Sequence, residues 1–436
     1  MEKIFILIPW FHPAYKAGGP IQSIVNMVKE LTVGSGQWAV GSSQLTVGSG
    51  EFSFNIFTSN KDLDGGVLEV ACDQWISGQW IMPAPYTKGY TGDNEVMPAL
   101  MTKGSSGDNA KTRIWYSSSN DILPVLKREI KEQKPDHFFV VGLYDWNYNF
   151  KPLLFTKGVN KIISVRGMLH PEALAQKPFK KKIYLWLWKL LGWHKKHLFH
   201  ATDDVEAGYI KKVFGSSARV AVAGNFPLLH ECLPMPAKQR GVLKLVSVAL
   251  ISPMKNYALV LMALQAVGSR LPIAIGMAVG SSQLASIEYN IYGPIKDGNY
   301  WEECKKLIRV MPPHIVINYH GAAPPDDIKK ALAANHVFIL PSKSENYGHS
   351  IIEALSAGRP VITSQGTPWN RLSDAKAGIN VDVGDISQLV DAIDRFVQMD
   401  QAEMEEWSRE ANTYAVNAVD VEAIKEQYRK LFGLNG

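Results

Sequence analysis

Residues 336–363 read HVFILPSKSENYGHSIIEALSAGRPVIT and decide the fold. The apolar run Val337–Leu340 predicts a short buried strand, and a polar loop follows it. Apolar residues then recur at helical spacing from Ile351 onward. Gly358, with Pro360 just beyond it, predicts the end of that helix. A strand, a loop and a helix in this order form the unit from which parallel α/β sheets are built.

The start of the predicted helix is a candidate anion site. Its first amides have no carbonyl partner within the helix, and the positive end of the helix dipole lies behind them. Two carboxylates bracket this point, Glu345 in the loop and Glu353 two turns along the helix. Two glutamates alone would more often be a solvated loop charge and a helix surface residue. The strand, Gly348 and the helix in register with them favour a binding site.

This stretch resembles the E-x7-E motif of glycosyltransferase family 4, the retaining nucleotide-sugar glycosyltransferases, with Glu345 and Glu353 at its two glutamate positions. The resemblance implies the GT-B fold, an α/β architecture of two Rossmann-like domains facing across a cleft, with this motif in the second domain. It also implies that Glu345 contacts the transferred sugar and Glu353 the ribose. The other donor-binding residues that it implies here are Asn346, Tyr347, Gly348, His349 and Ser350.

A second motif precedes this one. ISPMKN follows the predicted strand VLKLVSVAL and resembles the donor loop of the family, R-x4-K, whose two cations hold the donor diphosphate. Lys255 matches the lysine and is expected to be catalytic together with Glu345. Leu250 stands where the arginine is expected, and a leucine cannot make a charge-assisted contact. We therefore expect either weakened activity or another cation, such as Arg359 or Arg371, in its place.

Candidate residues also follow predicted strands in the first half of the chain. Gly18 and Gly19 come after an apolar strand and open a helix, where a glycine pair lets a ligand approach the backbone. A tight turn is the alternative, but the family has a similar loop that faces the donor phosphates. Arg166 could balance phosphate or acceptor charge. His170 could bond a sugar hydroxyl as a third catalytic residue, or could be a partly buried loop histidine.

Composition limits the function classes. The chain has 436 residues, 46% apolar and 20% charged, which suits two folded domains. Its net charge of +5 is too small to predict nucleic-acid binding. Three widely spaced cysteines predict a reducing cytoplasm rather than disulfides. The sequence shows no His/Asp set spaced for a metal, so we expect a metal-independent protein without a cofactor.

The domain boundaries follow from these motifs. We expect an acceptor-side domain over 1–227, a proline-containing hinge over 228–241 and a donor domain over 242–410. The helices of 411–436 are expected to cross back to the first domain. Gly/Ser-rich fragments such as LTVGSG, at 31–36 and 45–50, recur without a fixed period. They predict insertions, engineered or natural, at 32–50, 77–110 and 268–286.

Residues 177–197, KPFKKKIYLWLWKLLGWHKKH, predict a basic amphipathic helix that carries tryptophan. Such a helix suits the surface of an anionic membrane. The alternative is a domain helix with its apolar face in the core and its lysines in solvent.

The resemblance therefore implies a retaining glycosyltransferase that moves a sugar from a nucleotide diphosphate sugar to a glycan or lipid-linked acceptor. Such an enzyme in polysaccharide biosynthesis is expected in the cytoplasm, free or peripheral on the inner face of the membrane. Two alternatives remain open at this point. One is a non-catalytic or engineered sugar-nucleotide-binding scaffold, favoured by Leu250 and the repeats. The other is a sugar-nucleotide epimerase, which shares the fold.

Overall fold

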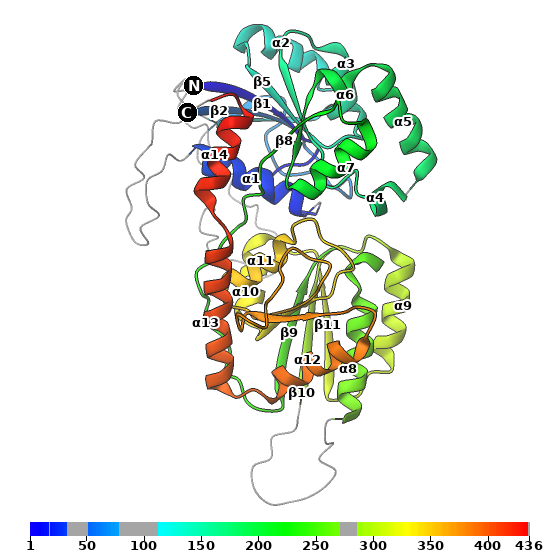
Figure 1. The fold of residues 1–436 in the computed structure, drawn as a ribbon, viewed down its shortest axis with the longest axis vertical. Coiled ribbons are helices and arrows are strands. Elements are labelled where there is room, and N and C mark those ends of the chain that lie inside the picture. Colours follow the sequence, from blue (N-terminus) through cyan, green and yellow to red (C-terminus); the bar gives the residue numbers. More distant parts are fainter. Residues whose placement is uncertain (17, 33–50, 78–111, 176, 271–285, 435–436) are drawn as a thin grey trace, which may run out of the picture. The chain divides into compact units, whose positions relative to one another are not determined.

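The computed structural model describes the chain except residues 17, 33–50, 78–111, 176, 271–285 and 435–436 (Figure 1). The three expected insertions lie almost wholly outside the described residues. The chain divides into two compact units. The first comprises residues 1–226 with 421–436, and the second residues 227–420.

Among the described residues, the first unit has an eight-stranded sheet in the order β3-β4-β2-β1-β5-β6-β7-β8. Its pairs are parallel except β3 with β4. Central strands such as β1 and β5 are continuous apolar runs because parallel sheets are covered on both faces. The strands are β1 (Glu2–Leu7), β2 (Phe52–Ser59), β3 (Trp75–Ser77), β4 (Thr112–Ser117), β5 (His137–Val141), β6 (Asn160–Ser164), β7 (Leu198–Ala201) and β8 (Arg219–Val222).

Helices cover both faces of this sheet and form a separate apolar core on each. The helical segments are α1 (Gly19–Thr32), α2 (Leu123–Gln133), η2 (Trp146–Phe150), α3 (Lys151–Phe155), α4 (Pro171–Ala175), α5 (Pro178–Leu190), α6 (Trp193–Lys196), α7 (Asp204–Phe214) and α14 (Val421–Leu431). The last of these, α14, returns to the first unit from the C-terminal end of the chain. Its Tyr428 and the following Phe432 are fully buried there, and Lys425 lies 3.2 Å from Glu30 of α1.

The second unit has a parallel six-stranded sheet, in the order β11-β10-β9-β12-β13-β14 among the described residues. Its strands are β9 (Val242–Val248), β10 (Ser286–Tyr292), β11 (Ile315–Gly321), β12 (Val337–Leu340), β13 (Val361–Ser364) and β14 (Gly378–Val381). Its helical segments are η3 (Pro253–Lys255), α8 (Tyr257–Arg270), α9 (Gly298–Arg309), α10 (Pro325–Ala333), α11 (His349–Ser356), α12 (Ile386–Gln398) and α13 (Gln401–Ala418).

The strand order of this sheet reverses between β9 and β12. From β9 the chain builds outward through β10 and β11, and it then returns to start β12 on the other side of β9. Loops at the carboxyl ends of two strands at such a point diverge and leave room for a ligand. The two loops that follow β9 and β12 are those that carry Lys255 and Glu345.

The segment expected as a hinge, 228–241, belongs to the second unit and is held to it by hydrogen bonds. The amide of Leu233 donates to Ala357 O at 3.1 Å. Buried Lys238 donates from Nζ to the carbonyls of Val397 and Met399 at 3.1 and 2.6 Å. The C-terminal boundary lies between 420 and 421 rather than at 411, so α13 is part of the second unit.

The basic segment 177–197 is divided into two helices. Gly192 adopts φ +66° between α5 and α6, a backbone conformation that costs glycine little. Leu185 and Trp188 of α5 are buried in the core of the first unit. In the described part of the chain, no helix combines the length and the apolar character required to cross a bilayer.

Candidate active site

Lys255 and Glu345 form an ion pair in the second unit, with Nζ 2.5 Å from Oε1. Lys255 ends η3, which follows β9, and Glu345 lies in the loop after β12. Because β9 and β12 are parallel neighbours, both loops leave the sheet at the same edge. The side chains are 21% and 11% exposed, so the pair is largely screened from water yet still accessible.

The loop that carries Glu345 is held by hydrogen bonds to two neighbouring segments. The amide of Lys343 donates to Met254 O at 2.9 Å, which ties this loop to η3. The amide of Glu345 donates to Gly366 O at 3.0 Å, which ties it to the loop after β13. Gly366 is required here, because a Cβ at this position would lie 2.4 Å from Lys343 O. The backbone around Glu345 is therefore fixed before any ligand binds.

Ser342 is a site residue that the sequence analysis missed. It is fully buried, and its hydroxyl donates to Oε1 of Glu345 at 2.6 Å. Its own carbonyl accepts a hydrogen bond from the Ser364 hydroxyl. A hydroxyl three residues before the glutamate, directly after the strand, was the available signal.

The predicted donor-binding loop leads into α11. Gly348 precedes the helix with φ +74°, and its carbonyl accepts the first bond of the helix from Ile351 N at 2.9 Å. Tyr347 is half-buried, and its carbonyl accepts a 2.5 Å hydrogen bond from Nε1 of Trp369. His349 lies beside the Tyr347 ring, with centroids 4.7 Å apart. Of the remaining predicted residues, Asn346 is exposed and Ser350 half-buried.

Glu353 lies on α11 and is half-buried. Burial raises the pKa of its carboxyl to about 8, because the charged form loses solvation. No hydrogen bond or ion pair within the described residues engages this carboxyl. It is therefore protonated near neutral pH and can both donate and accept a hydrogen bond.

The two arginines expected to substitute for an arginine at position 250 both have protein partners in the structure. Arg359 is fully buried and donates to the carbonyls of Leu233 and Asn335, so the expectation that it holds a ligand is wrong. Burial also lowers the pKa of its guanidinium to about 10. Arg371 is 85% exposed and pairs with Asp374 at 3.1 Å. Leu250 itself is half-buried in the loop after β9.

In the first unit, Gly18 and Gly19 lie where α1 begins, as predicted. Gly18 has φ +71° with open space at its Cβ position, and its carbonyl accepts from Ile21 N at 3.1 Å. Arg166 contacts the same helix, since its Nη1 donates to Ser23 Oγ at 2.8 Å and also to Asn225. The structure therefore brings Arg166 and the glycine pair to one helix, although this arginine nitrogen has protein partners.

His170 lies at the start of α4. Its Nδ1 accepts a hydrogen bond from the amide of Glu172 at 3.3 Å, and its ring packs edge-on against Tyr209 at 5.1 Å. With Nδ1 engaged in this way, the neutral ring carries its proton on Nε2. His170 is thus positioned by α4 and α7, not by α1.

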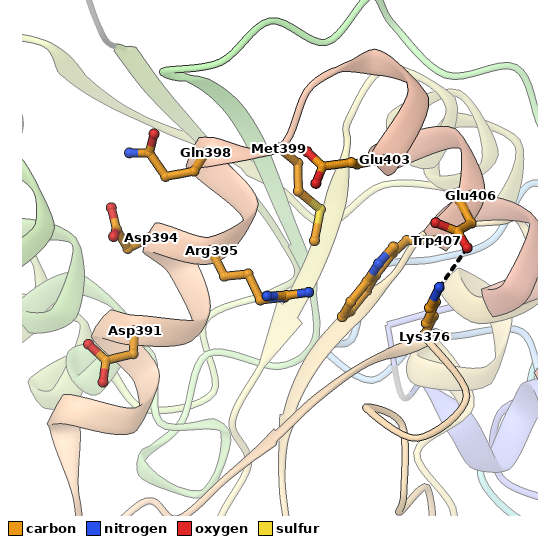
Figure 2. Close-up of a pocket in the computed structure, with 9 residues that line it drawn as sticks. All are labelled: Lys376, Asp391, Asp394, Arg395, Gln398, Met399, Glu403, Glu406 and Trp407. Atoms are coloured by element: carbon orange, nitrogen blue, oxygen red, sulfur yellow. Dashed lines mark hydrogen bonds and ion pairs between the residues drawn. The ribbon is translucent and has the colours of Figure 1, made fainter.

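A hollow with a volume of about 580 Å³ lies between α12 and α13 (Figure 2). Lys376 and Glu406 pair across it at 2.7 Å, and Arg395 lies over the Trp407 ring at 5.2 Å. Lys376 precedes β14 and Met399 follows α12, so the hollow is at the amino edge of the sheet. That is the edge opposite Lys255 and Glu345, and no predicted site residue lines it.

The described residues contain no group of three or more His, Cys, Asp or Glu side chains that could hold a metal ion. Metal independence stays a prediction.

Comparisons with known proteins agree with this architecture. Residues 236–414 match the family model described as glycosyl transferases group 1. The sulfoquinovosyl transferase SQD2 of Arabidopsis thaliana is 34% identical over 100 residues, which are 22% of this chain and 19% of that protein. The lipopolysaccharide core biosynthesis glycosyltransferase LpsE of Rhizobium meliloti is 32% identical over 108 residues, 24% of this chain and 31% of that protein. The chain thus spans less than a third of either relative in these matches.

Solved structures share the fold over the whole chain. Anabaena HepE, solved in complex with UDP and glucose, superposes with a TM-score of 0.59 at 14% identity and covers 99% of both chains. Sucrose-phosphate synthase from Thermosynechococcus elongatus matches over its full length with a TM-score of 0.62 at 14% identity, and the glycosyltransferase WaaG does so with a TM-score of 0.59 at 12% identity. The chain therefore has the fold of these solved structures, and its residues 236–414 match the model of group 1 glycosyl transferases.

Proposed function

We propose that the protein is a retaining, metal-independent glycosyltransferase that uses a nucleotide diphosphate sugar. The observation that carries this proposal is the Lys255–Glu345 pair of 2.5 Å, held at the carboxyl edge of the sheet beside the start of α11. An ammonium, a carboxylate and helix amides at one place suit a ligand that carries both a diphosphate and a sugar.

The donor would exchange partners with this pair. Its diphosphate takes the Lys255 ammonium and the first amides of α11, while Oε1 of Glu345, still held by Ser342, accepts a hydrogen bond from a sugar hydroxyl. Departure of the nucleoside diphosphate builds negative charge on the phosphate oxygens. Donors fixed in advance stabilise that charge more in the transition state than in the ground state. We assign to Lys255 the role of assisting the leaving group, which its place at the carboxyl edge of the sheet supports.

Glu353 would bind the ribose. Its carboxyl is half-buried, has a pKa of about 8 and is engaged by no hydrogen bond among the described residues. A protonated carboxyl can donate to one ribose hydroxyl and accept from the other. The complex of HepE with UDP and glucose supports a uridine nucleotide as the first donor to test.

We assign supporting roles to the first unit. Gly18 and Gly19 let a ligand phosphate approach the start of α1, and Arg166, which follows β6, adds positive charge beside that helix. His170 bonds an acceptor hydroxyl through Nε2. We propose a glycan or lipid-linked acceptor in polysaccharide biosynthesis, reached in the cytoplasm at the inner face of a membrane. The likeness to LpsE supports this class.

The test is nucleotide release from a panel of UDP-, GDP- and ADP-sugars with EDTA present. Release should persist in EDTA and fall at least a hundredfold in Lys255→Ala and Glu345→Ala. Lys376→Ala is the matched control, since it removes a lysine from an equally short ion pair at the opposite edge of the sheet. Equal losses in all three variants would contradict the proposed site. The anomeric configuration of the first product, read by NMR, decides retention.

Leu250 favours a second candidate, a sugar-nucleotide-binding protein without catalysis. Without a second cation at that position, a diphosphate would be bound but its departure less well stabilised. Calorimetric binding of UDP at micromolar affinity, with no turnover of any donor, would select this candidate.

A further inference from the structure

The exposed side of α5 is a stripe of large apolar residues. Phe179, Ile183, Trp186 and Leu190 recur every three or four positions, so they share one face of the helix. They are 75%, 46%, 58% and 65% exposed. The opposite face is the one that packs in the core, through Leu185 and Trp188. An apolar face of three turns that remains exposed in this way marks an interaction surface.

Lysines flank this stripe. Residues 177–197 contain seven lysines and no aspartate or glutamate. Lys181 is half-buried and donates to Ala173 O. The other six, which are exposed, are Lys177, Lys180, Lys182, Lys189, Lys195 and Lys196. No ion pair within the described ranges involves any of these six.

A further exposed aromatic residue belongs to the same unit as α5. Trp146 of η2 is 54% exposed and stacks on Phe150 at 4.7 Å. Phe150 in turn contacts Tyr184 of α5, with ring centroids 5.7 Å apart. Figure 1 shows α5 at the periphery of its unit. Exposed tryptophans beside lysines are the residues that bilayer interfaces favour.

We infer that this face, defined by Phe179, Ile183, Trp186 and Leu190 with their flanking lysines, docks on an anionic phospholipid bilayer. The stripe enters the boundary between headgroups and acyl chains, and the lysines contact the lipid phosphates. Charge complementarity selects this occupant, because an apolar partner alone would not need the exposed lysines of 177–197, which make no ion pair with any other described residue. The biological purpose of this docking, which is to bring the site to a lipid-linked acceptor, rests on the proposed function. The observations on α5 do not depend on that function.

The test is co-sedimentation of the full chain with vesicles of phosphatidylcholine alone or with 30% phosphatidylglycerol. Binding should require phosphatidylglycerol and weaken in 0.5 M salt. Lys180→Gln/Lys182→Gln should lower the partition coefficient about 25-fold, and Phe179→Ser/Trp186→Ser at least tenfold. The matched controls on α7, Lys211→Gln/Lys212→Gln and Val205→Ser, change exposed residues and should bind as the wild type does.

Failure of the wild type to bind anionic vesicles would overturn the inference, as would equal losses in the α5 and α7 variants. Sedimentation velocity without lipid checks the other occupant. A dimer that Phe179→Ser/Trp186→Ser converts to monomer, with no vesicle binding, would assign the face to a second copy instead. Nucleotide release without vesicles separates this inference from the proposed function. The α5 variants should still release nucleotide. If the wild type binds vesicles but releases no nucleotide, only the proposed glycosyltransferase function is refuted.

Discussion

The hydroxyl of Ser342 donates a 2.6 Å hydrogen bond to Oε1 of Glu345, the same oxygen that pairs with Lys255. Both groups that hold this oxygen are donors, and Ser342 is fully buried. The serine therefore fixes the carboxylate from the protein side, while the lysine lies on the side open to a ligand. If Lys255 turns to a diphosphate, Ser342 is the partner that keeps Glu345 in place.

Ser342→Ala should lower kcat for donor turnover about tenfold and leave KM for the donor nearly unchanged. A hydrogen bond to a charged group contributes roughly 1.5–3 kcal/mol, and here it orients the carboxylate rather than binding the donor. Steady-state kinetics measure the split between kcat and KM. Ser344→Ala, in the same loop and half-buried, is the control and should retain full activity. A change in KM alone would argue against a positioning role.

Glu353 should make the protein less stable as the pH rises. Its folded pKa of about 8 lies above the ordinary value near 4.5, so the unfolded chain releases this proton first. The neutral carboxyl makes its full contribution to the free energy of unfolding below about pH 4.5, and this contribution is lost between about pH 4.5 and 8. Glu353→Gln imitates the neutral form and should therefore not show this loss.

Urea unfolding at pH 5 and pH 8 measures this effect. The free energy of unfolding of the wild type should fall relative to Glu353→Gln by at least about 1 kcal/mol, since each pKa unit corresponds to about 1.4 kcal/mol. Glu410→Gln, which alters an exposed glutamate of α13, is the control. Parallel pH profiles for wild type and Glu353→Gln would show that Glu353 ionises normally.

Arg359→Lys should reduce the stability of the second unit by about 2–3 kcal/mol without weakening nucleotide binding. The buried guanidinium donates to the carbonyls of Leu233, Asn335 and Ala357, and an ammonium cannot reach all of them. Chemical denaturation measures the loss, and calorimetry with UDP checks affinity on the folded protein. Arg395→Lys, an exposed arginine of the same unit, is the control. If Arg359→Lys remained stable but lost affinity for UDP, this result would indicate that Arg359 does bind the ligand.

The sequence predicted the elements with local signals and missed contacts made between distant segments. The strand Val337–Leu340 and the helix that ends before Gly358 were visible because apolar spacing and a positive-φ glycine are local features. The role of Arg359 was not visible, since its main carbonyl partner, Leu233, is 126 residues away. Because Arg359 lies beside the motif in sequence, a ligand-binding role was suggested. Its burial and its hydrogen bond to the Leu233 carbonyl instead give it a structural role.

The basic helix shows the same limit. Its composition allowed either a core helix or a membrane helix. In the structure, α5 has one apolar face in the core, with Trp188 buried, and another apolar face that is exposed, with Trp186. The sequence could separate these faces only once the start of α5 was known. The ion pair of Lys255 with Glu345, 90 residues apart, was expected as a shared site through the resemblance and not as a direct contact.

Leu250→Arg should strengthen donor use. Leu250 follows β9 and is half-buried in the loop that leads to η3, the segment that carries Lys255. A guanidinium there can add a charge-assisted contact to a diphosphate, worth roughly 1.5–3 kcal/mol. We expect UDP affinity or the rate of nucleotide release to rise at least tenfold, as measured by calorimetry and by release in EDTA.

Leu250→Gln has a similar length but no charge and should give little gain. An equal gain in both variants would point to loop rearrangement, and no gain in Leu250→Arg would mean that position 250 does not face the diphosphate.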